Sequence, residues 1–281
     1  MFESPFAKAL KERSKSVLIA GMGGGYDIFT SVPLYFELVH LLGPDAKIAL
    51  ANLSITPNLT EPSKLGDKLT PHCLRVRYRD YIDSGQPDAF KESLGYPKNY
   101  FAEFHLSKWF HQAKGIDQPV FAFEIDSCAS LIESYHAVVQ SCGCDTVILI
   151  DGGTDSLQRG DEEWLGTFQE DMLSIAAVGF GLVEIKNKFL VTTIMGSEGI
   201  SDQAYMENVA EMQRMGAMLG ANFLQSQMPS VQSYIDCMMA SIPANSTINM
   251  QMVAALQGNW GHYVPPEIKS RGVMPSEVFI H

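Results

Sequence analysis

Residues 16–27 read SVLIAGMGGGYD, an apolar run followed by three consecutive glycines and an acid. The apolar run ends in glycine, which predicts a short buried strand over residues 16–20. Glycines let backbone N–H groups approach a ligand closely, as in phosphate-binding loops. Asp27, however, would repel a bare phosphate unless a divalent cation lay between them. The stretch therefore predicts either a phosphate held together with a metal or a ligand rich in hydroxyl groups.

Outward from this stretch, apolar strand patterns alternate with helical ones. Further strands are predicted over residues 47–53, 73–76, 120–125 and 146–150, with a hairpin made of 182–185 and 189–194. Helical spacing of apolar side chains predicts helices within residues 34–42, 100–112, 131–139, 172–179 and 209–219. This order predicts a Rossmann-like α/β fold, a doubly wound and mostly parallel sheet with helices on both faces.

The domain organisation follows from length and from the breaks in the pattern. A chain of 281 residues that is 46% hydrophobic is expected to form one α/β domain over residues 1–281. Prolines and glycines interrupt residues 54–118, which we expect to be an irregular insertion, a lid or a partner contact. Residues 225–281 are expected to form a helical C-terminal extension.

Composition excludes several classes of partner. The net charge is -12 and no basic run is long enough for a nucleic-acid or anionic-membrane footprint. The charged N-terminus lacks the apolar core of a signal peptide, and no run of about 18 apolar residues predicts a membrane span. Five cysteines, an odd number, favour reduced thiols and hence a cytoplasmic protein. We expect a small-molecule substrate as the partner, and self-association is left open.

Three predicted loops place glycine beside an acid at the end of a strand, at residues 21–27, 151–162 and 196–202. The carboxyl ends of parallel strands share one edge of the sheet, where ligands bind. We therefore expect Asp27, Asp151 and Asp155 to be catalytic carboxylates, acting as a general base or as metal ligands. A divalent cation such as Mg²⁺ would be held by Asp151, Asp155, Asp161 and Glu162. The candidate ligand-binding residues are Gly23, Gly24, Gly25, Gly152, Gly153, Thr154, Arg159, Glu198 and His262.

Each candidate has a structural alternative. Asp27 could cap the next helix, and Asp171 could simply complement the dipole at the start of another. Asp155 and the later acids of its loop could be exposed, with Arg159 as their counter-charge. The pair Cys142-Gly-Cys144 is weak evidence of a metal site, because buried thiols are commoner.

Familiar motifs fit poorly. The first loop matches two glycines of G-x-G-x-x-G but has Tyr26 at the third position, and the second predicted strand lacks an acid for a ribose. The sequence contains neither G-x-x-x-x-G-K-[ST] nor G-x-S-x-G. The leading prediction is an enzyme that hydrolyses or transfers a group on a phosphorylated or nucleotide-like, hydroxyl-rich molecule, by acid/base or metal-assisted chemistry. A nicotinamide-type oxidoreductase and a non-catalytic ligand-binding sensor or scaffold are the alternatives.

Three segments carry a family resemblance: GGGYDIFTSVPL (23–34), DGGTDSLQRGDEEWLGTFQEDML (151–173) and GSEGISDQAY (196–205). With them the chain resembles an uncharacterised family, number eleven fifty-two among the domains of unknown function. The resemblance implies a Rossmann-like fold with one shared site at the sheet edge, and it implies no activity. The chain departs from the family at Ser197 and Glu198, where a more open glycine, cysteine and aspartate pattern is expected.

Overall fold

The computed structural model describes residues 4–56, 66–83, 100–162, 166, 168–194, 200–241, 246–259 and 264–266. Their seven-stranded sheet has the order β3-β4-β5-β2-β1-β6-β7. The strands are β1 (Ser16–Gly21), β2 (Lys47–Ser54), β3 (Gly66–Thr70), β4 (Cys73–Val76), β5 (Val120–Glu124), β6 (Thr146–Asp151) and β7 (Asn187–Thr192). The five strands β5, β2, β1, β6 and β7 run parallel, and an antiparallel β3–β4 hairpin extends the sheet beside β5.

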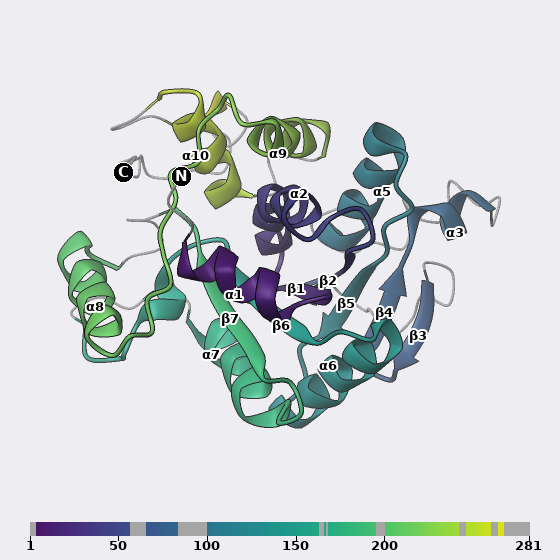
Figure 1. Cartoon of the computed structure of the whole chain (residues 1–281). Coiled ribbons are helices and arrows are strands. Elements are labelled where there is room, and N and C mark those ends of the chain that lie inside the picture. The colour runs from purple at the N-terminus through teal and green to yellow at the C-terminus, as the bar shows by residue number, and fades with distance from the viewer. Residues whose placement is uncertain are drawn as a thin grey trace.

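Helices cover both faces of this sheet (Figure 1). The α-helices are α1 (Pro5–Arg13), α2 (Ser31–Leu42), α3 (Tyr78–Asp83), α5 (Ala102–Lys114), α6 (Cys128–Cys142), α7 (Gln169–Ala176), α8 (Asp202–Arg214), α9 (Pro229–Ala240) and α10 (Thr247–Leu256). Three short helical segments are η1 (Asp27–Thr30), η2 (Asp155–Leu157) and η3 (Ala177–Gly181). Figure 1 shows α2, α5, α9 and α10 on one side of the sheet and α6 and α7 on the other.

The burial of β1 explains why its sequence is a continuous apolar run. Val17 and Ile19 belong to the core under α2, α5, α9 and α10, whereas Leu18 and Ala20 belong to the core under α6 and η3. Successive side chains of a strand point to opposite faces, so a strand covered on both faces must be apolar at every position. The Rossmann-like, doubly wound prediction is confirmed.

The order of the strands fixes where a ligand crevice should form. From β1 the chain crosses to β2 on one side, and β6 later joins β1 on the other side. The carboxyl ends of β1 and β6 therefore flank the topological switch point of the sheet. The register brings Gly21 of β1 beside Ile150 of β6, so the two loops leave the sheet at the same level.

The structure shows which elements form in the predicted insertion over residues 54–118 and in the predicted C-terminal extension. Within residues 54–118, the described part contributes α3, α5 and the β3–β4 hairpin, and this hairpin belongs to the main sheet. After residue 225, α9 packs against α2 and η1, and α10 packs against α9 and η1. None of the described helices has the length and hydropathy needed to cross a membrane.

The predicted hairpin of residues 182–185 and 189–194 is wrong. Only β7 forms there, and it pairs in parallel with β6. Leu182 and Ile185 are buried in the core that includes α6 and η3. Their apolar spacing reflects this packing rather than a second strand.

Candidate metal centre

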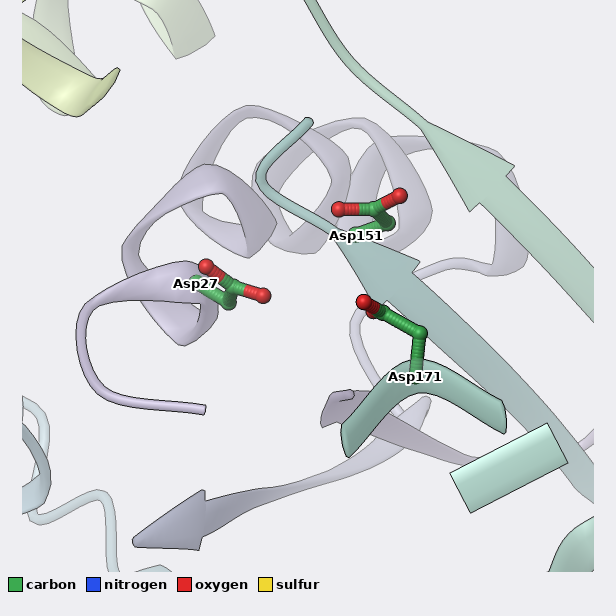
Figure 2. Close-up of side chains that lie close together, drawn as sticks. All are labelled: Asp27, Asp151 and Asp171. Atoms are coloured by element: carbon green, nitrogen blue, oxygen red, sulfur yellow. The ribbon is translucent and has the colours of Figure 1, made fainter. Parts of the chain in front are cut away.

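Three aspartates from three separate segments meet at the switch point. Asp27 begins η1 just after β1, Asp151 is the last residue of β6, and Asp171 lies in the first turn of α7. One carboxylate oxygen of each lies within 4.8 Å of those of the other two. Figure 2 shows the three side chains converging from their separate elements. We call Asp27, Asp151 and Asp171 the carboxylate cluster.

The glycines of both loops make room for these acids. A Cβ on Gly23 would lie 2.5 Å from Oδ2 of Asp27 and 2.9 Å from Oδ1 of Asp171. A Cβ on Gly152 would lie 2.7 Å from Oδ1 of Asp27. These separations are shorter than any ordinary carbon–oxygen contact, so neither position accepts a side chain without movement of the acids. Glycine is therefore needed at positions 23 and 152 because the carboxylates of Asp27 and Asp171 occupy the space that a side chain would fill.

Backbone N–H groups of the glycine loops donate to the protein's own acceptors. Asp27 accepts hydrogen bonds from the N–H of Gly23, at 2.9 Å, and from the N–H of Gly152. The N–H of Gly25 donates to the carbonyl of Leu53 at 3.2 Å. Part of the anion-binding capacity of the loops is therefore used by Asp27.

Asp151 is held in the same way by its own loop. Its side chain is 1% exposed and accepts hydrogen bonds from the N–H of Gly153, at 2.6 Å, and of Ser156, at 3.2 Å. The N–H of Thr193, beyond β7, donates to the carbonyl of Gly153 at 3.1 Å. These bonds fix the direction in which the Asp151 carboxylate points.

The acids raise one another's pKa. Burial raises the pKa of Asp27 well above its ordinary value, and the charge of Asp151 raises it further. Burial, together with the charge of Asp155, raises the pKa of Asp151 to about 6, although hydrogen bonds to its carboxylate oppose the shift. Asp171 shifts to a pKa of about 9, first through burial and then through the charges of Asp151, Asp155 and Asp27. Both buried environment and like charge thus disfavour a fully ionised cluster.

Several of the acid oxygens also lack hydrogen-bond donors. Both side-chain oxygens of Asp155 and Oδ1 of Asp171 are buried and accept no hydrogen bond within the described part of the chain. Asp155 and Asp171 are 1% and 2% exposed. In the same described part, no basic side chain forms an ion pair with the carboxylate cluster or with Asp155. Buried carboxylates without counter-charge are unfavourable unless they take up protons or a cation.

The remaining predicted residues of the 151–162 loop lie apart from this cluster. Thr154, between Gly153 and Asp155, is buried but is not a member of the cluster. Arg159 is exposed, and its guanidinium pairs with Glu211 of α8 at 2.6 Å and with Asp161 at 3.4 Å. Its position agrees with the alternative that Arg159 serves as counter-charge to loop acids.

Glu162 stabilises the turn over residues 159–162 through its side chain. Its carboxylate accepts hydrogen bonds from the N–H groups of Arg159 and Gly160 and from the side-chain amide of Asn208. Burial opposes ionisation of Glu162, but these hydrogen bonds outweigh it and lower its pKa to about 2. Two further predicted residues, Glu198 and His262, lie outside the described residues.

Sequence reasoning treated Asp171 only as a complement to a helix dipole and did not single out Glu103. Glu103 of α5 is completely buried, and its Oε1 accepts a hydrogen bond from Nδ2 of Asn52 at 2.7 Å. The same Nδ2 donates to the carbonyl of Gly25 at 2.7 Å. Burial raises the pKa of Glu103 to about 7, and the hydrogen bond from Asn52 limits the rise. The Glu103–Asn52 pair therefore links α5 and β2 to the glycine loop through the hydrogen bond from Asn52 to Gly25.

A family described as a protein of unknown function, DUF1152, matches residues 99–268. The chain belongs to the DUF1152 family. The DUF1152 segment contains Asp151 and Asp171 and begins after Asp27, so the carboxylate cluster joins the segment to the N-terminal β1 loop. No curated protein and no solved structure matches the chain.

Proposed function

We propose that the protein is a divalent-metal-dependent enzyme that hydrolyses or transfers a group on a small phosphorylated, nucleotide-like substrate. The observation that carries the proposal is the convergence of Asp27, Asp151 and Asp171 within 4.8 Å, with like charges around them. A cation bound between these carboxylates would offset the repulsion that otherwise keeps part of the cluster protonated.

The donor set favours a hard cation. The cluster offers carboxylate oxygens from three aspartates, with no cysteine or histidine among its members. Oxygen-only sites suit Mg²⁺, Mn²⁺ or Ca²⁺ rather than softer metals. Mg²⁺ and Mn²⁺ commonly bind through a few carboxylates and complete their coordination with water and substrate phosphate, which fits a cluster of this size.

The hydrogen bonds of the loops indicate how a phosphate would bind. Because Gly23 and Gly152 already donate to Asp27, a phosphate at this site would be held chiefly through the cation. The switch point between β1 and β6 is where open α/β sheets bind nucleotides, which supports a nucleotide-like substrate.

The four acids would have two different roles in the reaction, cation binding and proton transfer. A bound cation would activate water and stabilise negative charge that develops on phosphoryl oxygens. Asp27, Asp151 and Asp171 would hold it. Asp155 is buried, its oxygens accept no hydrogen bond among the described residues, and its charge acts on both Asp151 and Asp171. We assign Asp155 the role of accepting a proton from the attacking group.

Titration with Mn²⁺, followed by electron paramagnetic resonance, tests the proposal. We expect the wild-type protein to bind Mn²⁺ and Asp151→Asn to bind it about 100-fold more weakly, since loss of a ligand should exceed the effect of losing an outer-shell partner. Arg159→Gln is the matched control in the same loop and should bind as the wild type does. A wild-type protein that leaves millimolar Mn²⁺ free would overturn the proposal.

Turnover separates an enzyme from a sensor. Nucleotides and sugar phosphates should be hydrolysed or should transfer a phosphoryl group in the presence of Mn²⁺, and Asp155→Asn should lose this activity while retaining Mn²⁺. If Mn²⁺ binds but no member of such a panel reacts, the centre is a ligand-binding one. Oxidation or reduction of added NAD(H) would instead favour an oxidoreductase.

A further inference from the structure

A second group of reactive side chains lies at the opposite end of β6 from Asp151. Helix α6 ends at Cys142, Gly143 follows in the left-handed conformation with φ 65°, and Cys144 precedes β6. The N–H of Cys144 donates back to the carbonyl of Val139 at 2.9 Å, which closes the helix in a tight turn. Apart from Gly143 itself and its chain neighbours Cys142 and Cys144, no heavy atom of the described residues lies within 4 Å of the place where a Cβ on Gly143 would be, so the rest of the chain leaves the turn open on that side.

The left-handed Gly143 is the one residue between the two cysteines, so the turn places Cys142 at the end of the helix and Cys144 at the entry to β6. The Ser141 hydroxyl lies 3.7 Å from Sγ of Cys142, and the Ser16 hydroxyl donates to Sγ of Cys144 at 3.8 Å. The hydrogen bond from Cys144 lowers the pKa of Cys142 to about 6 despite partial burial, with smaller contributions from Ser141 and the Arg75 guanidinium. The same thiol–thiol contact and burial raise the pKa of Cys144.

Arg75 of β4 supplies positive charge to this group. Its Nη2 pairs with Asp67 of β3, but its Nε is buried and has no hydrogen-bond partner among the described residues. Cys142 is half-buried, whereas Cys144 is 6% exposed. A partly exposed thiol next to a cation and backed by a second thiol is the environment of a reactive cysteine.

The other neighbours argue against a metal site or a third reactive thiol here. The described residues contain one group of three potential metal ligands, the carboxylate cluster, and the thiols are not part of it. Cys73 lies near Cys142, but burial and the nearby Cys142 charge raise the pKa of Cys73 to about 12, so it stays protonated. The chemistry is therefore confined to Cys142 and Cys144.

We propose that Cys142 and Cys144 form a dithiol that exchanges with low-molecular-weight disulfides such as oxidised glutathione. The Cys142 thiolate attacks one sulfur of the external disulfide, forms a mixed disulfide and releases one thiolate. Cys144 then gives its proton to solvent and attacks the Cys142 sulfur, which forms the Cys142–Cys144 disulfide and releases the second thiolate. Two electrons pass from the protein to the external disulfide. A disulfide across one residue closes a small ring, so we expect it to be readily reduced again.

Alkylation rates test the nucleophile. Cys128 is the matched control, because it begins the same helix and is also half-buried. With iodoacetamide at pH 7, followed by peptide mass spectrometry, Cys142 should react about tenfold faster than Cys128. Arg75→Gln should reduce this difference without changing the rate at Cys128. Equal rates at the two cysteines in the wild-type protein would overturn the assignment of Cys142 as the nucleophile.

Equilibration with reduced and oxidised glutathione tests the pair. The wild-type protein and Cys128→Ser should form the Cys142–Cys144 disulfide, whereas Cys144→Ser should retain glutathione on Cys142 and Cys142→Ser should form neither product. Circular dichroism shows whether each serine variant is folded, and the wild-type result alone decides the question if one is not. A wild-type protein that keeps the glutathione adduct on Cys142, as Cys144→Ser does, contradicts the proposal. This result is independent of Mn²⁺ binding at the carboxylate cluster.

Discussion

The carboxylate cluster and the Glu103–Asn52 pair are two buried acidic sites at the same edge of the sheet. In the cluster, the charged neighbours of Asp171 are other acids, and one of its oxygens accepts no hydrogen bond within the described residues. Glu103 is equally buried, and its Oε2 also accepts no hydrogen bond within the described residues, but a side-chain amide donates to its Oε1 at 2.7 Å and the causes of its pKa shift include no neighbouring acid. Burial raises the pKa at both places. Uncompensated like charge, rather than burial, is what distinguishes the cluster and supports it as the proposed metal site.

The largest expected effect is on the pH dependence of stability in the presence of a chelator. A carboxyl whose pKa rises from 3.8 to about 9 on folding stabilises the folded state fully below about pH 4 and loses this contribution as the pH rises towards 9. Each unit corresponds to about 1.4 kcal/mol, so Asp171 alone accounts for several kcal/mol. Asp171→Asn should abolish much of this slope and be more stable than the wild type at pH 8.

Thermal unfolding from pH 4 to pH 9 measures this effect. Glu103→Gln is the comparison variant. It should remove only the part of the pH dependence of stability that lies between pH 4.5, the ordinary pKa of a glutamate, and pH 7, because the pKa of Glu103 in the folded protein is about 7. An Asp171→Asn variant with the same slope as the wild type would mean that the cluster is already compensated.

The next largest effect is stabilisation of the folded protein by a bound cation. We expect the cation to bind at the carboxylate cluster and not at the Glu103–Asn52 pair. At a free Mn²⁺ concentration 100 times the Kd, the wild-type protein should gain about 2.7 kcal/mol, seen as a rise in Tm. Glu103→Gln should gain as much, and Asp151→Asn should gain far less. A loss of the Mn²⁺ effect in Glu103→Gln would show that the two sites are not separable.

Removal of the acid of the Glu103–Asn52 pair should have a smaller effect, of the opposite sign to that of Asp171→Asn. Glu103→Leu leaves an Nδ2 hydrogen of Asn52 buried without its acceptor, which should lower the free energy of unfolding by about 2 kcal/mol. Glu103→Gln keeps an acceptor oxygen and should lose less than about 1 kcal/mol at pH 5. Urea denaturation at that pH compares them, and equal losses would show that the hydrogen bond is not what stabilises the pair.

The smallest effect is expected at the outer end of the 151–162 loop. Arg159 is exposed, and its ion pairs with Glu211 and Asp161 are at the surface. Exposed ion pairs contribute little, so Arg159→Gln should change Mn²⁺ affinity by less than about twofold. A larger change, measured by the same titration, would mean that the outer loop belongs to the centre.

Strand patterns were enough to predict the fold and part of the site. Glycine and acid at two strand exits predicted that Asp27 and Asp151 would meet, because carboxyl ends of parallel strands share an edge, and the structure places them together. Asp171 was missed in this role because a helix N-terminus favours an acid whatever lies beyond it. Leu182 and Ile185 were placed in a strand because packing against another element produces the same apolar spacing.

The sequence by itself determined the alternation of strands and helices, the double coverage of β1 and the presence of glycine beside Asp27 and Asp151, because these depend on residues close together in the chain. Only the tertiary structure decided which acids have counter-charges. Asp161 faces Arg159, whereas Asp171 faces Asp27 and Asp151 from distant segments. Charge compensation depends on distances in space between groups far apart in sequence, and local pattern carries no information about those distances.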